Sequence, residues 1–240
     1  MIVDHTNRRV PGVLEDRDKD TVKAYLQAAK DSGLLAGVEE VTTDTGEAYG
    51  NAAREVFGES VRVTVDRFHV MQHLQKHLAQ ARREVRRSLP QDEAAEPEGS
   101  RWLWVTNAEN LSPGQRRTLA ALCERFPVLG RLREQREALR AMFEDGRLKT
   151  TGGGQWRITL WVEKARALGL KTLDRFCQTL ERWQEETADH FVSRSANGPA
   201  EGSDRGLRGI LARACGTANF RHFRARVLDA FGRPRPQEST

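Results

Sequence analysis

Long hydrophobic runs are absent from this sequence. No run of about 18 apolar residues occurs, so we expect no membrane-spanning segment and no membrane partner. The opening residues, MIVDHTNRRV, contain no apolar core of a secretory signal peptide. Both absences predict a cytoplasmic protein, which is nucleoid-associated if it binds DNA.

Cysteine is scarce as well. The three cysteines, Cys123, Cys177 and Cys215, are odd in number and far apart, which favours free thiols in a reducing compartment over a disulfide framework or a zinc ribbon. The 240 residues are 38% hydrophobic and 30% charged, which indicates a rather polar protein of one or two domains.

Acidic residues are almost missing near the C-terminal end. Residues 205–235 contain eight arginines against one acid, Asp229, a net charge of +7 in a chain whose total is +5. Arginines at this density are typical of surfaces that bind nucleic-acid phosphates. The alternative is a solvated, arginine-rich helix face. The candidate DNA-binding residues are Arg205, Arg208, Arg213, Arg221, Arg224 and Arg226.

The first part of the chain alternates strand and helix patterns. We predict a β-hairpin over 2–14 and helices over 16–32 and 46–57. Strands over 38–43 and 61–65 are expected to pair in parallel, because a helix connects them.

From about residue 68 onward the sequence is predicted to be almost entirely helical. Ser112 and Pro113 form a typical helix start. An acidic linker over 91–100 and a flexible, glycine-rich loop over 150–155 interrupt the helices. Further helices are expected over 68–88, 128–144, 156–168, 172–191, 203–214 and 219–231, with a glycine-rich turn over 196–203.

Three separated acids are candidates for chemistry. Asp44 and Asp66 each end a strand, and parallel strands bring their C-terminal ends to one edge of a sheet. Glu201 precedes the basic C-terminal segment. Each acid could instead cap a helix or interact with its dipole. Carboxylates beside a basic segment suit Mg²⁺, which prefers oxygen ligands, so the pattern gives the hypothesis of metal-assisted cleavage or transfer of nucleic-acid strands.

Histidines recur every fourth residue after Asp66, at His69, His73 and His77. Such spacing can bind zinc on one helix face, but position 70 is valine, where the metalloprotease motif has its glutamate. A polar face near phosphates is the alternative for His73 and His77.

Four segments together resemble a known family. They are TDTGEAY (43–49), DRFHV (66–70), NGPAEG (197–202) and GTANFRHFRARVL (216–228). In this order they resemble bacterial insertion-sequence transposases of the DDE class, of the ISL-three lineage. TNAENLSP (106–113) is similar to the helical insert of that family, so the resemblance extends over essentially the whole chain.

The resemblance implies an α/β fold: a ribonuclease-H-like core lacking its first strand, with a large all-α insertion, mostly helical as a whole. The core would comprise residues 1–66 and 196–231, the insertion 67–195, and residues 232–240 would be a disordered tail.

The resemblance also implies roles for single residues. Asp44 matches the second catalytic aspartate and Glu201 the catalytic glutamate, so these two would be catalytic and would bind Mg²⁺. Asp66 and His69 match a signature that supports the site.

Two departures from the family pattern predict a truncated copy. The first catalytic aspartate of the family lies on an earlier strand than any in this sequence, and Asp4 matches a non-catalytic position. Ser203 and Asp204 stand where the family usually continues with two asparagines. We therefore expect this chain alone neither to cleave nor to join DNA.

Three functions remain open. The first is a transposase that cleaves and transfers DNA strands with Mg²⁺ during transposition of an insertion sequence, catalytically incomplete in this chain. The second is a non-enzymatic remnant that binds DNA or multimerises with full-length transposase. The third is a stand-alone nuclease with Asp4 as replacement acid. The expected partners are DNA, as element ends and target, and further transposase copies.

Overall fold

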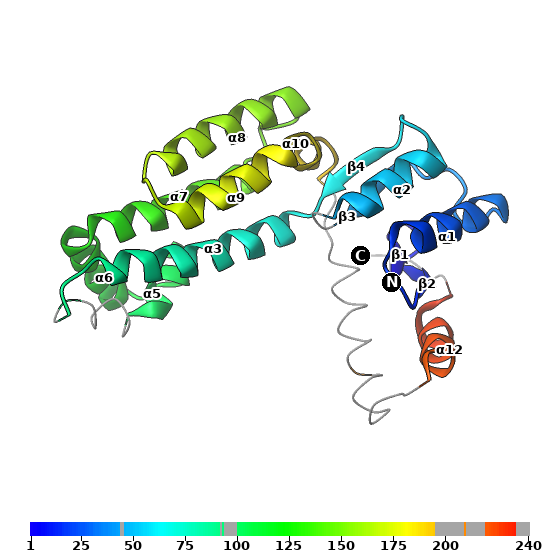
Figure 1. Ribbon diagram of the computed structural model, residues 1–240, viewed down its shortest axis with the longest axis horizontal. Helices are drawn as coiled ribbons and strands as arrows, with labels where there is room; N and C mark the ends of the chain where they lie inside the picture. Colours follow the sequence, from blue (N-terminus) through cyan, green and yellow to red (C-terminus); the bar gives the residue numbers. More distant parts are fainter. Residues whose placement is uncertain (44–45, 92, 94–99, 195–208, 210–218, 234–240) are drawn as a thin grey trace. The chain divides into compact units, whose positions relative to one another are not determined.

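The structure is a computed structural model that describes residues 1–43, 46–91, 93, 100–194, 209 and 219–233 (Figure 1). Most described residues are helical and the strands form two small sheets, so the prediction of a mostly helical protein is confirmed. The chain divides into two compact units. We call Met1–Thr64 with Ser195–Thr240 the sheet unit, and Val65–Arg194 the helical unit. Assigning a catalytic core and an insertion to parts of the chain stays a prediction.

Short strands and amphipathic helices alternate in the sheet unit. Its elements are β1 (Ile2–Asp4), β2 (Arg9–Gly12), α1 (Lys19–Asp31), β3 (Glu40–Thr43), α2 (Glu47–Phe57), β4 (Arg62–Val65, whose last residue begins the helical unit) and α12 (Phe220–Phe231). The predicted hairpin is confirmed, because β1 and β2 pair antiparallel with Asp4 opposite Arg9. The helices predicted over 16–32, 46–57 and 219–231 are confirmed as α1, α2 and α12, within a few residues at their ends.

The pairing of β3 with β4 is parallel, as predicted. The backbone N–H of Arg62, at the start of β4, donates to the carbonyl of Glu39, just before β3. Further along both strands, the hydroxyls of Thr42 and Thr64 lie 3.1 Å apart. Residue numbers therefore rise together along the two strands, and α2 supplies the connection between them.

Three small apolar clusters hold the sheet unit together. One joins α1 to α2, the second joins α2 to the β3–β4 sheet, and the third joins the hairpin to α12. Their buried residues are Val22, Leu26, Ala52 and Val56; Ala53, Val61 and Val63; and Val10, Val13 and Val227. The third cluster fixes α12 on the hairpin, although about 210 residues separate them in the sequence.

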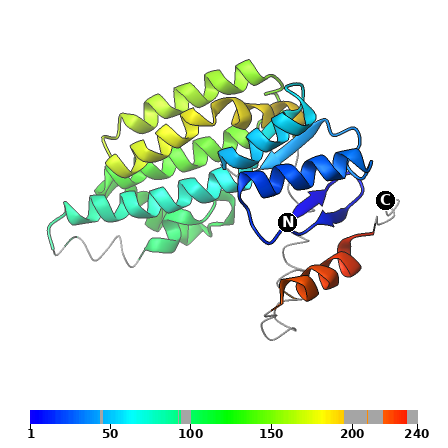
Figure 2. The ribbon, with the colours of Figure 1, turned by 45° about the vertical axis from the view of Figure 1, so that its right-hand side comes forward.

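The helical unit contains a four-helix bundle. Its elements are α3 (Arg67–Arg87), α5 (Arg101–Val105), the short 3₁₀ helix η1 (Ala108–Asn110), α6 (Pro113–Arg125), α7 (Pro127–Glu144), α8 (Thr151–Arg166), α9 (Lys171–Arg182) and α10 (Gln184–Ser193). α3 contacts α7 and α9, and α8 contacts the same two, so the four helices close a ring (Figures 1 and 2). No helix in the described part of the chain is both long and apolar enough to span a bilayer.

Each helix of the ring contributes a fully buried aliphatic side chain. Leu74, Leu139, Ile158 and Leu173 come from α3, α7, α8 and α9, and all four are 0% exposed. Burying one such side chain contributes about 1.5–3 kcal/mol relative to leaving it in water. The predicted start of α6 is also confirmed, because Ser112 and Gln115 form a capping box in front of Pro113.

The prediction of a flexible loop over 150–155 is wrong. α8 begins at Thr151, and the hydroxyl of Thr150 accepts a hydrogen bond from the backbone of Gly153 as its N-cap. A Cβ at Gly154 would lie 2.4 Å from Cδ2 of Phe191 on α10, so a larger residue does not fit this contact. Gly154 therefore allows close packing of α8 on α10, and this packing outweighs the low helix propensity of glycine.

The single helix predicted over 172–191 is also wrong, because α9 and α10 are separated at Trp183. This residue has φ −106° and ψ 27°, outside helical geometry. The side-chain amide of Gln184 donates to the carbonyl of Gln155 and the hydroxyl of Thr159, both on α8. The break thus sets α10 against α8. The predicted linker and the turn over 196–203 lie mostly or wholly outside the described residues, as do most of the predicted helix over 203–214 and of the tail over 232–240.

Candidate functional site

Asp66 lies where β4 ends and α3 begins, and it is 2% exposed. Its Oδ1 accepts a hydrogen bond of 3.0 Å from the backbone N–H of Phe68, which makes it the N-cap of α3. Its Oδ2 lies 3.1 Å from Nδ1 of His69. Both carboxylate oxygens are therefore engaged, and the helix-cap alternative for Asp66 is confirmed. Its supporting role in a catalytic site stays a prediction.

His69 places a partly exposed imidazole beside this buried carboxylate. Its side chain is 36% exposed, and its ring meets that of Phe68 edge-on at a centroid distance of 6.1 Å. Phe68 itself is 52% exposed. With a proton on Nδ1 donated to Asp66, Nε2 accepts a hydrogen bond, and the protonated ring donates one. His69 can thus bind a phosphate oxygen or exchange a proton with one.

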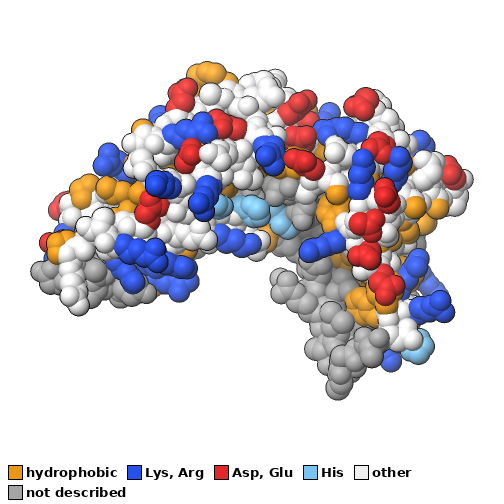
Figure 3. Space-filling model, in the orientation of Figure 1, with side chains coloured by type: hydrophobic (Ala, Val, Ile, Leu, Met, Phe, Trp, Pro, Cys, Tyr) orange, Lys and Arg blue, Asp and Glu red, His pale blue; other side chains and the backbone are white. Residues whose placement is uncertain are grey.

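The three histidines of α3 engage different partners. Nδ1 of His77 lies 2.9 Å from the carbonyl of Thr172, and its ring packs at 5.8 Å from that of Phe176. His73, between His69 and His77, is half-buried and makes polar or ring contacts of its own. Histidine side chains gather over the N-terminal part of α3 on the face seen in Figure 3. Among the residues that the structure describes, no group of three or more His, Cys, Asp or Glu is placed to hold a metal ion.

Five predicted site residues lie outside the described residues. They are Asp44, Glu201, Arg205, Arg208 and Arg213. Their predicted roles in metal and DNA binding stay predictions.

The other three predicted DNA-binding arginines lie on α12. Arg221, Arg224 and Arg226 are all exposed, whereas Val227 of the same helix is 0% exposed. The side chain of Asn219 caps the helix by accepting from the backbone N–H of Arg221 at 2.9 Å. A capped helix anchored by its apolar side therefore presents three guanidinium groups to solvent. Because the backbone of this helix is already ordered, only the arginine side chains lose conformational entropy when they bind phosphate.

Asp4 is engaged in the hairpin turn. Its carboxylate accepts hydrogen bonds from the backbone and side chain of Asn7, at 3.0 and 2.8 Å, and from Nε of Arg9, at 2.9 Å. Burial acts to raise the pKa of Asp4, but these hydrogen bonds outweigh burial and the pKa is lowered. The contacts give Asp4 a structural role, and its use as a replacement catalytic acid has no support from them.

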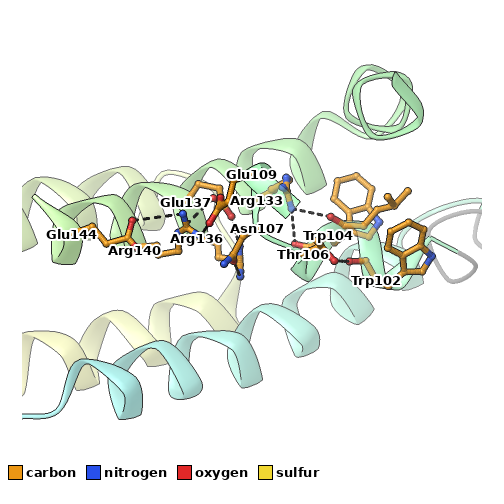
Figure 4. A network of polar contacts seen from close by, with 11 residues as sticks. Trp102, Trp104, Thr106, Asn107, Glu109, Arg133, Arg136, Glu137, Arg140 and Glu144 are labelled. Carbon is orange, nitrogen blue, oxygen red and sulfur yellow. Dashed lines mark hydrogen bonds and ion pairs between the residues drawn. The ribbon is translucent and has the colours of Figure 1, made fainter. Parts of the chain in front are cut away.

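The sequence interpretation missed a polar network on α7, shown in Figure 4. Nη1 of Arg133 donates to the carbonyls of Leu103 and Trp104, at 2.8 and 3.2 Å. One turn later, Arg136 donates to the side chain of Asn107, and after a further turn Arg140 pairs with Glu109. Arginines 133, 136 and 140 lie three and four residues apart, within the apolar pattern of α7. These arginines interrupt the apolar pattern, and that interruption could have indicated from the sequence that this helix holds another segment by polar contacts.

A family model described as a transposase, of the ISL3 type in the DDE class, matches residues 1–227. No curated protein and no solved structure matches the chain.

Proposed function

This chain belongs to the ISL3-type family of DDE transposases, and from that membership we propose that it takes part in moving an insertion sequence by cleaving and transferring DNA strands. The family match over residues 1–227 carries the proposal, because it covers all of the helical unit and most of the sheet unit. Within the proposal, the sheet unit is the core of a ribonuclease-H-like domain, which its antiparallel hairpin and its parallel β3–β4 pair support. The protein would act in the cytoplasm, at nucleoid DNA.

The proposed catalytic carboxylates are Asp44 and Glu201. A donor set of carboxylate oxygens suits Mg²⁺, which when bound activates an attacking hydroxyl and stabilises the leaving oxygen of a phosphodiester. Support for these residues comes from the sequence, since both lie outside the described residues. Asp66 and His69 would assist by holding an imidazole toward a DNA phosphate, in the geometry of the α3 cap.

DNA binding is proposed to involve the exposed arginines of α12. Each guanidinium that neutralises a phosphate releases counterions, which makes binding depend steeply on salt. These three side chains project from a helix whose apolar side is buried against the hairpin. The same observation favours a second candidate function, DNA binding without strand chemistry.

The first experiment measures DNA binding against salt concentration, by fluorescence anisotropy with a duplex of an insertion-sequence end. Replacing Arg221, Arg224 and Arg226 by glutamine is expected to weaken binding at low salt. It should also make the slope of log K against log salt less steep by about 0.9 for each lost phosphate contact. The matched control replaces three exposed arginines of the helical unit, Arg117, Arg131 and Arg175, and so changes net charge equally. Equal losses in both triple variants would show that charge alone matters and would refute a role for α12.

The second experiment separates the two candidate functions. The chain is incubated with end DNA with and without Mg²⁺, and strand cleavage is followed on denaturing gels. Mg²⁺-dependent cleavage that D44N and E201Q abolish, without loss of DNA binding, supports the transposase reaction. Salt-dependent binding with no cleavage under any condition supports the second function.

We also propose that copies of the transposase associate with one another.

A further inference from the structure

A groove of about 600 Å³ lies on the helical unit, between η1, α6 and α7. Leu111 and Leu119, both buried, form much of its apolar lining together with Ala108 and Ala120. Its acidic lining residues are Glu109, Glu134 and Glu137. Arg116 and Arg133 line it as well, and Glu109 and Glu137 form ion pairs with Arg140 and Arg136 of α7. The exposed Glu134 is thus the acid of the groove that a basic group of another molecule can approach.

α5 lies next to this groove, and its exposed face is apolar with one basic residue. Leu103 and Trp104 face the core and are 3% and 6% exposed. Trp102 and Val105 face outward and are 46% and 43% exposed, and Arg101 beside them is exposed too. We call Arg101, Trp102 and Val105 the knob. Large apolar side chains left in water beside a cation are typical of protein interfaces, where tryptophan and arginine dominate the binding energy.

The polar network of α7 fixes the knob and the groove on one rigid surface. Arg133 lines the groove and also donates to the carbonyls of Leu103 and Trp104 in α5. Arg136 and Arg140 hold the segment that connects α5 to α6, through Asn107 and Glu109 (Figure 4). Knob and groove therefore keep their spacing before any partner binds, which lowers the entropy cost of association.

We infer that the groove is occupied by the knob of a second copy of this chain. The inference rests on the proposed self-association and names its surface. A knob and a complementary groove side by side on one surface allow a two-fold arrangement, in which each copy fills the groove of the other. Trp102 and Val105 enter the apolar lining, and Arg101 faces the acidic edge at Glu134. Opposite charges at the edge set the register of the two copies.

The test is sedimentation of the full chain without DNA, so its result does not depend on DNA binding or strand chemistry. The wild type is expected to form dimers at micromolar concentrations. W102A removes the knob, and A120R blocks the groove from an exposed position of α6. Each change acts twice in a symmetric dimer, so each should raise the dissociation constant by about 100-fold or more. The matched control is W156A, which removes a tryptophan of α8 that is 61% exposed and lies outside the groove.

A mixture of the two variants distinguishes a knob in a groove from any other contact. W102A retains an intact groove and A120R retains an intact knob, so a mixed pair regains one of its two contacts. The mixture should form heterodimers at concentrations where either variant alone is monomeric. The inference is overturned if the wild type is monomeric, if W156A dissociates as W102A does, or if the mixture associates no better than its components.

Discussion

Gly154 gives a sharp test of how α8 packs. It lies in the first turn of α8, where a Cβ would be 2.4 Å from Cδ2 of Phe191 and 3.0 Å from Cβ of Ala188. Phe191 is 1% exposed and stacks on Phe143 at 5.5 Å, so it has little room to move. Gly152, two residues earlier in the same turn, would meet nothing within 4 Å. We predict that Gly154→Ala destabilises the helical unit and that Gly152→Ala stabilises it.

The two substitutions share the same backbone gain and differ only in packing. Alanine in place of glycine within a helix stabilises by up to about 1 kcal/mol. Overpacking a filled core costs about 1–3 kcal/mol. At Gly154 the overlap opposes the gain, whereas at Gly152 only the gain applies. The two variants should therefore differ in free energy of unfolding by about 1–3 kcal/mol.

Tryptophan fluorescence in urea measures this difference within one unit. All five tryptophans, Trp102, Trp104, Trp156, Trp161 and Trp183, belong to the helical unit, so their emission reports its unfolding and not that of the sheet unit. With a urea slope of about 1–3 kcal/mol per molar, the midpoints should differ by several tenths of a molar or more. Equal midpoints for the two variants would refute the packing argument, because they are the result expected of a flexible loop over 150–155.

Two further predictions concern single side chains of the helical unit. Hydrogen bonds from the side chain and backbone of Thr172 lower the pKa of Glu84, so its stabilising effect is fully present above about pH 4.5 and is lost as pH falls through the lowered pKa. E84Q should therefore lower the urea midpoint at pH 7, and the difference from wild type should shrink toward pH 3; a constant difference at all pH values would contradict this. Cys177 is 0% exposed, and this burial raises the pKa of its thiol to about 11, whereas Cys123 is only half-buried. In C215S at pH 8, a thiol reagent should modify Cys123 and reach Cys177 only on unfolding, as peptide mapping by mass spectrometry would show; equal labelling rates would contradict the buried position.

Local chemistry decided which parts of the fold could be predicted. The helix start at Ser112 was predictable, because a capping side chain and the residues that it contacts lie within one turn. The parallel strands were predictable from the helix that connects them. Gly154 and Trp183 misled the interpretation, because their conformations depend on α10 and α8, which pack together only in the folded protein. Glycine propensity is a weak preference that one close helix contact can reverse.

The candidate site shows the same division between local and distant contacts. Arg133 reaches carbonyls about 30 residues earlier in the chain, and no spacing in the sequence shows where a guanidinium will find its acceptors. The exposed arginines of α12 could be identified because charge density is visible in sequence. Which side of α12 is buried, however, depends on Val10 and Val13 of the distant hairpin.

Asp66 shows why spacing alone cannot separate a catalytic carboxylate from a structural one. A metal ion and a helix N-terminus both use carboxylate oxygens, so an aspartate between a strand and a helix suits either role. The sequence does, however, contain the residue that engages the second oxygen. His69 follows at the third helical position, where the imidazole can reach back to the cap, and Oδ2 of Asp66 lies 3.1 Å from Nδ1 of His69. An Asp-x-x-His pattern at this junction therefore specifies a cap together with an oriented imidazole. In that arrangement one carboxylate oxygen of Asp66 caps the helix and the other lies against the imidazole.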